Sequence, residues 1–210
     1  MTTKTANKHE LKTRETRALL LKAAETIFAR DGYEGSELGE IAALAGRTKG
    51  AIYAQFKSKE DVFLALIEDR TQRSREKIEK LLAESKTIDE NIRMLRTFYL
   101  ERIDDRAFCI LLLEFKLFAM RHPEAKKRLQ KHYAAIFADH DGKRLSNPFG
   151  TAATGADGVG CLVAIQSMQS VISALVLEAQ LGNALSDKDA VRRVTGRIFD
   201  ALMEVPTANG

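Results

Sequence analysis

The sequence predicts an all-α protein of about nine helices arranged in two domains. The composition favours helices, because the 210 residues include only 3 Pro and no Trp, while the strong helix formers Ala, Leu, Lys and Glu are abundant. Apolar residues also recur at spacings of three and four along most of the chain, which is the spacing of one helical face. We expect residues 1–57 to form the first domain, with 1–11 as a disordered arm, and residues 58–210 to form the second.

The first domain is predicted to hold three helices, and the first of them runs over residues 13–31. Its inward face carries Leu20, Ala24, Ile27 and Phe28. The second helix spans residues 38–45. Ser36 is expected to cap this second helix by accepting a backbone N–H bond.

Gly46 and Thr48 predict a tight turn into the third helix. Gly46 suits the end of the second helix because glycine adopts a positive φ easily, and Thr48 suits the start of the third as its cap. Ile52 and Phe56 then point inward. The outer surface carries Lys49, Gly50, Ala51, Tyr53, Ala54 and Gln55. Small, polar and basic residues on the second of two closely joined helices are typical of a helix-turn-helix that enters the DNA major groove.

Seven short motifs follow one another between residues 20 and 60, namely LLKAA, IF, DGY, IA, AG, TKGAIY and FKSKE. In order and spacing they make residues 16–67 resemble the N-terminal domain of the TetR family of transcriptional regulators. The rest of the chain is similar to this family only in length and helical character. The resemblance implies a homodimeric DNA-binding regulator whose second domain binds an effector and dimerises.

The residues expected to contact DNA lie mainly on the third helix. The resemblance implies that the Tyr53 hydroxyl contacts a phosphate, and packing within the three-helix core is the alternative. Lys49 is placed to bond guanine or a phosphate, the alternative being a solvated lysine, while Ala51 suits a thymine methyl group. Lys59 would add charge at a helix N-terminus. The full predicted set is Arg14, Arg17, Ser36, Arg47, Thr48, Lys49, Gly50, Ala51, Tyr53, Ala54, Gln55 and Lys59.

Three residues depart from the family pattern. Arg47 stands where the turn usually has an apolar residue, so we expect its side chain to reach outward to the DNA backbone. Gly39 lacks a side chain that often helps to read bases from the second helix. Glu37 places a negative charge near the expected phosphate path. The affinity for DNA, or the register on it, is therefore expected to differ from that of proteins with the usual family pattern.

The excess positive charge lies in the first domain. Residues 1–59 hold 11 Lys and Arg against 7 Asp and Glu, whereas residues 60–210 hold 22 of each. The whole formal charge of +4 therefore accompanies the helix-turn-helix, as binding to phosphates requires. Double-stranded DNA with a palindromic site is the predicted partner, bound by a homodimer.

The second domain is predicted to begin with a long helix that Ser58 and Asp61 open as a capping box and that runs to about Ala83. Its charged stretch over residues 68–80 indicates a solvated connector between the domains. The following helices are expected at residues 87–106, 107–121, 123–137, 159–181 and 187–203, with a long loop over 141–158.

The helix over 107–121 is apolar on nearly all sides, which suggests a mostly apolar pocket for a small molecule. For each candidate residue, core packing or solvent exposure is the alternative interpretation. The candidate pocket residues are Tyr99, Phe108, Leu112, Glu114, Phe115, Phe118, His132, Tyr133, Met168, Gln169 and Ile172. An apolar or amphipathic effector is therefore expected.

The last two predicted helices carry more apolar surface than one packing face needs, which indicates a four-helix interface between two copies. The expected interface residues are Leu162, Ile165, Leu175, Val176, Val191, Val194, Ile198 and Leu202. Cys109 and Cys161 show no paired spacing and are expected to be buried free thiols of a cytoplasmic protein.

The sequence shows no pattern for chemistry. The four histidines have no metal-ligand spacing, and no apolar run approaches about 20 residues, so we expect no enzyme activity, cofactor, metal site or membrane span. The prediction is a repressor released from DNA by an effector. Two alternatives remain: a DNA-binding regulator controlled by a protein partner, and, less favoured, an enzyme or carrier with an accessory DNA module.

Overall fold

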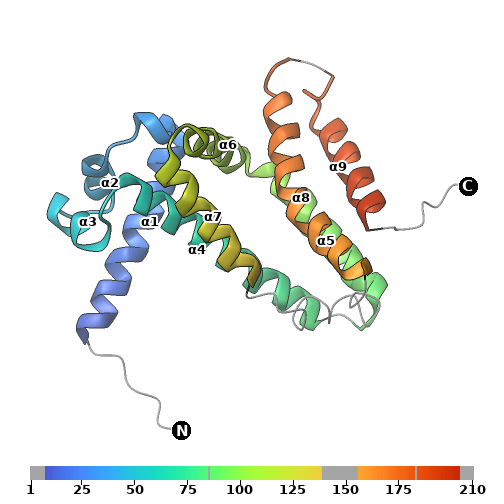
Figure 1. Cartoon of the computed structure of the whole chain (residues 1–210), viewed down its shortest axis with the longest axis horizontal. Helices are drawn as coiled ribbons and strands as arrows, with labels where there is room; N and C mark the ends of the chain where they lie inside the picture. Colours follow the sequence, from blue (N-terminus) through green and yellow to red (C-terminus); the bar gives the residue numbers. More distant parts are fainter. Residues whose placement is uncertain (1–7, 85, 139–155, 183, 204–210) are drawn as a thin grey trace, which may run out of the picture. The chain divides into compact units, whose positions relative to one another are not determined.

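Figure 1 shows the computed structural model of the chain, which describes residues 8–84, 86–138, 156–182 and 184–203. Within these ranges the chain forms nine α-helices, one short 3-10 helix and no strand, which confirms the predicted all-α class. Contacts divide the chain into two compact units, Met1–Gln72 and Arg73–Gly210. The predicted functional boundary after residue 57 stays a prediction.

The first unit contains α1 (Lys8–Gly35), α2 (Leu38–Leu44), α3 (Lys49–Gln55) and the first part of α4 (Lys59–Ala83). Residues 8–11, expected in a disordered arm, belong to α1 instead, while 1–7 lie outside the described residues. Gly32, at φ 73°, interrupts the helical path of α1 close to the predicted end at residue 31.

Three aromatic rings hold the first unit together. Phe63 of α4 meets Phe28 and Tyr33 edge to face, with ring centroids 5.2 and 5.3 Å apart. Ile41 of α2 and Ile52 of α3 are also fully buried. All four helices thus contribute buried side chains to this unit, and this close packing fixes how α2 and α3 are presented.

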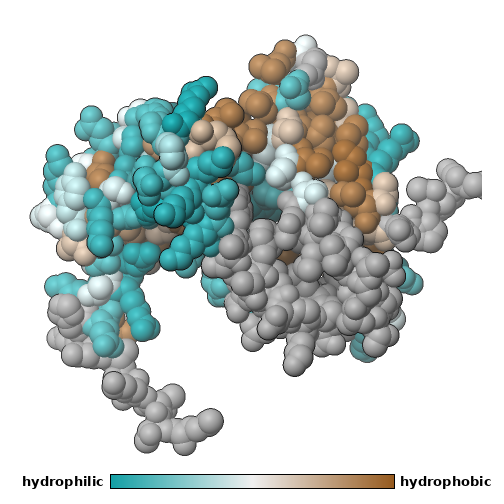
Figure 2. All heavy atoms as spheres, viewed as in Figure 1, coloured by the Kyte–Doolittle hydropathy of each residue, from teal (hydrophilic) through white to brown (hydrophobic). Residues whose placement is uncertain are grey.

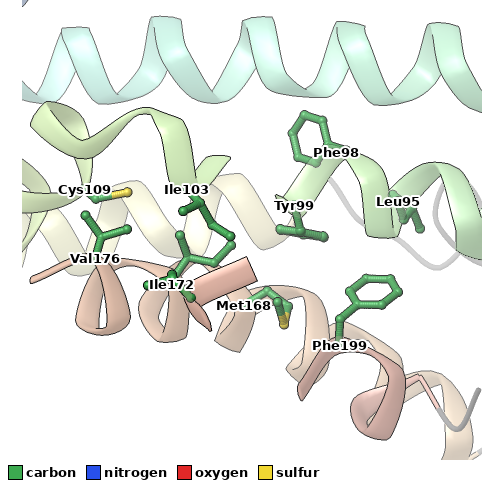
Figure 3. Close-up of a cluster of buried hydrophobic side chains, with 10 residues drawn as sticks. Leu95, Phe98, Tyr99, Ile103, Cys109, Met168, Ile172, Val176 and Phe199 are labelled. Carbon is green, nitrogen blue, oxygen red and sulfur yellow. The ribbon is translucent and has the colours of Figure 1, made fainter. Parts of the chain in front are cut away.

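The second unit consists of the rest of α4 and the remaining elements. These are α5 (Ile88–Glu101), η1 (Arg102–Asp104), α6 (Arg106–Arg121), α7 (Pro123–Ala138), α8 (Ala156–Glu178) and α9 (Lys188–Leu202). Helix α6 packs against α7 and α8, and α9 packs against α5 and α8. Figure 3 shows the core cluster between these helices, where Ile103 and Cys109 face Ile172 and Val176 of α8.

Three predicted boundaries in this unit are wrong. The helix expected over 87–106 ends at Glu101, because η1 tightens the chain and Asp105 leaves the helical region at φ −89° and ψ 57°. The loop expected over 141–158 falls largely outside the described residues, but 156–158 already form the first turn of α8. Helix α8 ends at Glu178, three residues before the predicted stop.

Most of the predicted caps are confirmed. Thr48 accepts the Ala51 N–H at 3.2 Å, and Asp187 accepts N–H bonds from the first turn of α9. Ser58 accepts the Asp61 N–H at 3.2 Å while the Asp61 carboxylate accepts the Lys57 N–H at 2.9 Å. Among the described residues, no helix is both long enough and apolar enough to cross a membrane.

Candidate nucleic-acid interface

The turn between α2 and α3 has the geometry that the sequence predicts. Gly46 adopts φ 63°, and its N–H donates to the Ala43 carbonyl at 3.0 Å. The Arg47 N–H donates to the Ala42 carbonyl at 2.9 Å. These bonds close α2, and the Thr48 cap then opens α3 within two residues.

Helix α3 separates an inward face from an outward one. Ile52 and Phe56 are buried, as predicted. Lys49, Gly50, Tyr53 and Ala54 are exposed, and Ala51 and Gln55 are half-buried. Tyr53 shows 52% of its surface to solvent, so the core-packing alternative for this residue is wrong. A flat row of small residues flanked by a lysine and a tyrosine is therefore free to approach another surface.

Lys49 lies back along α2. A Cβ added to Gly39 would stand 3.8 Å from Lys49 Cε and 4.0 Å from its Nζ. A Cβ at position 39 would therefore be in ordinary van der Waals contact with the lysine stem, which runs across the N-terminal part of α2. Position 39, which the sequence suggested only as a missing reader of bases, thus also neighbours the Lys49 side chain.

Two arginines flank α3. The Arg17 guanidinium lies 4.6 Å from the centroid of the Phe56 ring, an arrangement that holds a cation over an aromatic face. Arg47 is half-buried, and its Nη1 donates to the Gly46 carbonyl at 3.2 Å, so part of this side chain turns back onto the helix-turn-helix. Arg14 is exposed on α1.

Ser36 and Lys59 have partners that the sequence did not reveal. Ser36 is only 3% exposed and its hydroxyl donates to the Tyr33 carbonyl at 2.9 Å, so its side chain neither caps α2 nor faces outward. Glu37 occupies the cap position of α2 without a side-chain cap bond. Lys59 Nζ donates to the carbonyl oxygens of Glu34 and Ser36, at 2.9 and 3.2 Å.

The acidic groups of α1 and α2 are partly neutralised. Arg30 donates to Asp31 at 2.6 Å and to Glu40 at 2.5 Å. Its hydrogen bond holds the pKa of the Asp31 carboxyl below the ordinary value, and the two carboxylates together raise the pKa of Arg30. Glu37 remains exposed.

Leu44 is exposed beside the turn. It lies three residues after the buried Ile41, so helical spacing alone does not predict this exposure.

Residues 20–66 match the family model described as "Bacterial regulatory proteins, tetR family". This region of the chain belongs to the TetR family. A curated relative, the HTH-type transcriptional regulator AcrR of Shigella flexneri, is 45% identical over 58 residues, which are 28% of this chain and 27% of that protein. The chain thus matches about a quarter of the length of this relative.

Two solved structures resemble nearly the whole chain in fold. The fatty acid degradation regulator FadR of Bacillus halodurans has a TM-score of 0.64 at 17% identity, covering 96% of this chain and 98% of that one. FadR of Bacillus subtilis, solved in complex with stearoyl-CoA, has a TM-score of 0.61 at 19% identity, covering 90% of this chain and 99% of that one. At these identities the likeness shows a shared fold.

The predicted pocket residues of the chain fall into separate groups. Tyr99, Met168 and Ile172 pack in the core cluster of Figure 3, which fits the core-packing interpretation. Phe108, Leu112 and Phe115 are buried along α6, and Phe118 stacks on Phe115 with ring centroids 6.0 Å apart. Glu114 and Gln169 are half-buried, and the side chains of His132 and Tyr133 lie outside the described residues. Contact with a ligand stays a prediction.

The predicted dimer-interface residues also fall into buried, partly buried and exposed groups. Val176 and Val191 are each 2% exposed within the core cluster, so neither is available to a second copy and both assignments are wrong. Leu175 and Ile198 are partly buried against this cluster, Val194 is half-buried, and Leu202 is exposed. The side chains of Leu162 and Ile165 lie outside the described residues. Leu177 in the last turn of α8 and Leu181 just after α8 are exposed, although neither is among the interface residues predicted from the sequence.

Proposed function

We propose that the chain is a transcriptional repressor that binds a palindromic DNA operator as a homodimer and is released by a small apolar or amphipathic molecule. The observation that carries the proposal is the outward face of α3. There, Lys49 and Tyr53 flank Gly50 and Ala51. The helix is held in place by the buried side chain of Ile52 and by the N-cap residue Thr48. Small side chains at the centre let the helix backbone approach base edges, while the flanking residues suit guanine and phosphate oxygens.

Charge supports the same surface. All of the formal excess lies in residues 1–59, and Arg14, Lys49 and Lys57 are exposed there. Each phosphate that such a cation neutralises releases a counterion, so binding is expected to weaken steeply with salt. Arg17, held over Phe56 near the end of α3, would add a positioned cation at the edge of the contact.

The dimer is supported by exposed apolar side chains on the last two helices. Figure 2 shows hydrophobic surface gathered over α8 and α9. Among the described residues, the exposed large apolar side chains of this part of the chain are Leu177 in α8, Leu181 just after α8 and Leu202 in α9, and Leu181 shows 67% of its surface. Apolar groups gathered in this way mark an association surface, and two recognition helices related by a two-fold axis require a palindromic site.

The effector is supported by the aromatic and apolar surplus of α6, where Phe108, Leu112 and Phe115 are buried together. It is also supported by the shared fold with the Bacillus subtilis FadR that was solved with stearoyl-CoA, an amphipathic molecule. An effector of this kind shifts the equilibrium between DNA-binding states only through its different affinity for them.

Footprinting of the purified protein on genomic DNA, followed by gel shifts on the protected site, tests the proposal. Lys49→Ala and Tyr53→Ala should each weaken operator binding by about 1–3 kcal/mol. Lys22→Ala, which removes an exposed lysine from α1, is the matched control and should bind nearly normally. Wild-type affinity in both α3 variants would refute the assigned surface. A protected site without two-fold symmetry would refute the dimer.

A further inference from the structure

Arg30, near the end of α1, binds two carboxylates at once. Its Nε and Nη2 donate to Asp31 Oδ1 and Oδ2 at 2.7 and 2.6 Å, so the neighbouring residue holds the plane of the guanidinium. Nη2 also donates to Glu40 Oε1 of α2 at 2.5 Å, ten positions further along the chain. Arg30, Asp31 and Glu40 therefore form a clamp between α1 and α2.

Helix α2 depends on contacts of this kind to keep its place. It has only seven residues, which are too few for a helix that is stable by itself. Glu37 at its N-cap position makes no side-chain cap bond. Ile41 and Ala42 bury one side of α2, and the carboxylate of Glu40 ties an adjacent side to α1. The clamp thus adds a polar restraint to the apolar packing of this short helix.

The position of α2 in turn sets the position of α3. The Arg47 N–H donates to the Ala42 carbonyl at 2.9 Å, which ties the turn to α2. Gly39, next to Glu40, lies beside a side chain of α3, since a Cβ at position 39 would stand 3.8 Å from Lys49 Cε. A shift of α2 would therefore move the turn and the outward face of α3 with it.

The clamp is poorly suited to bind a phosphate itself. Its two carboxylates outweigh its one guanidinium, so the three side chains carry a formal charge of −1 together. A phosphate group would be repelled by this net charge. An effect of these residues on DNA binding is therefore expected to act through the arrangement of α2 and α3.

We infer that Arg30 is a positioning residue for operator binding: through Glu40 it holds α2, and hence the outward face of α3, in the orientation that DNA requires. This inference rests on the proposed function and adds to it a residue outside the contact surface. Loss of the clamp should not prevent folding, because the aromatic core around Phe63 does not include these side chains and an exposed ion pair contributes little to stability.

Two glutamates at the start of α2 allow positioning to be distinguished from charge. Glu40→Ala breaks the clamp, whereas Glu37→Ala removes the same charge three residues earlier, from an exposed side chain without a cap bond. Charge alone predicts that both variants bind DNA more tightly than the wild type. The clamp predicts that Glu40→Ala binds the operator about 3- to 10-fold more weakly, because each subunit of the dimer loses one ion pair. Glu37→Ala should bind at least as well as the wild type.

Affinity for an unrelated duplex of the same length provides a second measurement. Non-specific binding follows charge, whereas specific binding also requires α3 to be correctly oriented. The ratio of operator affinity to non-specific affinity should therefore fall in both Arg30→Ala and Glu40→Ala. In the double variant it should fall no further than in the more affected single variant. Melting temperatures measured in parallel establish that each variant is folded in the binding assay.

The outcomes separate this inference from the proposed function. Operator binding by Glu40→Ala that equals or exceeds that of Glu37→Ala overturns the positioning role. Additive losses in the double variant also overturn it, because Arg30 would then act independently of Glu40. Both results leave the proposed repressor standing, since the wild type and Glu37→Ala still bind the operator. If the wild type binds no specific site, the proposed function is wrong and the positioning role is wrong with it.

Discussion

Lys59 and Glu34 join the beginning of α4 to the end of α1. The Lys59 ammonium donates to the Glu34 carbonyl at 2.9 Å across 25 positions of sequence and also reaches the Ser36 carbonyl. It stands 4.9 Å from the Tyr33 ring centroid as well. An ammonium has three N–H donors, so one donor remains for a phosphate after these two bonds. The same side chain can therefore position the helix-turn-helix and contact DNA.

Lys59→Ala is expected to affect both stability and DNA binding. Losing the two carbonyl bonds should lower the free energy of unfolding by about 1 kcal/mol, measured by urea denaturation. Losing a phosphate contact should reduce the slope of log affinity against log salt by about 1. Lys57→Ala, which removes an exposed neighbour, is the control for stability and should unfold like the wild type. An unchanged salt slope in Lys59→Ala would exclude the phosphate contact.

The helix-turn-helix could be predicted because its determinants are local. Gly46, Thr48 and Ile52 act within a few residues of one another, through backbone conformation, a cap bond and helical spacing. The partners of Ser36 and Lys59 could not be predicted from nearby residues, because they depend on the path of the chain. The inward turn of Ser36 towards Tyr33 and the reach of Lys59 to Glu34 both follow from the turn at Gly32.

The positive φ of Gly46 predicts different effects for two substitutions at this position. Gly46→Ala should destabilise the first unit by about 1–2 kcal/mol, because an L-residue is strained at φ 63°. An added Cβ there meets no other described atom within 4 Å, so the effect should come from the backbone alone. Gly46→Asn should retain most of the stability, since asparagine tolerates this conformation. Equal losses in urea denaturation for both variants would contradict this explanation.

The second unit was harder to predict because its helices are apolar on more than one side. Val176 and Val191 looked like interface residues, yet they fill the core between α5, α8 and α9. Leu177 and Leu181 are exposed instead. Periodicity identifies an apolar face but does not say which of two apolar faces meets the chain's own core, and this requires the tertiary arrangement.

Asp104 predicts a loss of stability in acid. Its hydrogen bond from Lys188, together with the charge of Arg192, lowers the pKa of the Asp104 carboxyl below the ordinary 3.8. The folded protein therefore binds this proton more weakly than the unfolded chain does. The stabilisation is complete above the ordinary pKa and is lost as the pH falls through the lower pKa of the folded state.

The wild type and Asp104→Asn are compared by urea denaturation at intervals of about half a pH unit, from pH 6 downward. At pH 6 the variant should be less stable by under about 1 kcal/mol, because the pair is largely solvated. The difference between the two proteins should shrink as the pH falls below 3.8. A difference that stays constant to the lowest pH would show that the carboxylate charge is not responsible.

Gly196 of α9 lies directly beneath the guanidinium of Arg96 from α5. Arg96 Nε donates to Asp200 Oδ1 at 2.7 Å, one turn further along α9, so the arginine crosses the helix at the glycine. A Cβ at position 196 would lie 3.1 Å from Arg96 Cζ and still closer to its Nη2. The absence of a side chain therefore allows the Arg96 to Asp200 ion pair to close over α9.

Gly196→Ala should consequently have opposite effects in two backgrounds. In the wild type it should destabilise the protein by about 1–2 kcal/mol, because the guanidinium must move away from Asp200. In an Arg96→Ala background the same substitution should stabilise by up to about 1 kcal/mol, since alanine is the better helix former and the obstacle has gone. Urea denaturation of the four proteins of this cycle measures the coupling. Gly39→Ala in α2 is the control, because its Cβ would meet Lys49 only at an ordinary 3.8 Å. An effect of Gly196→Ala with the same sign and size in both backgrounds would mean that Arg96 does not decide the choice of glycine.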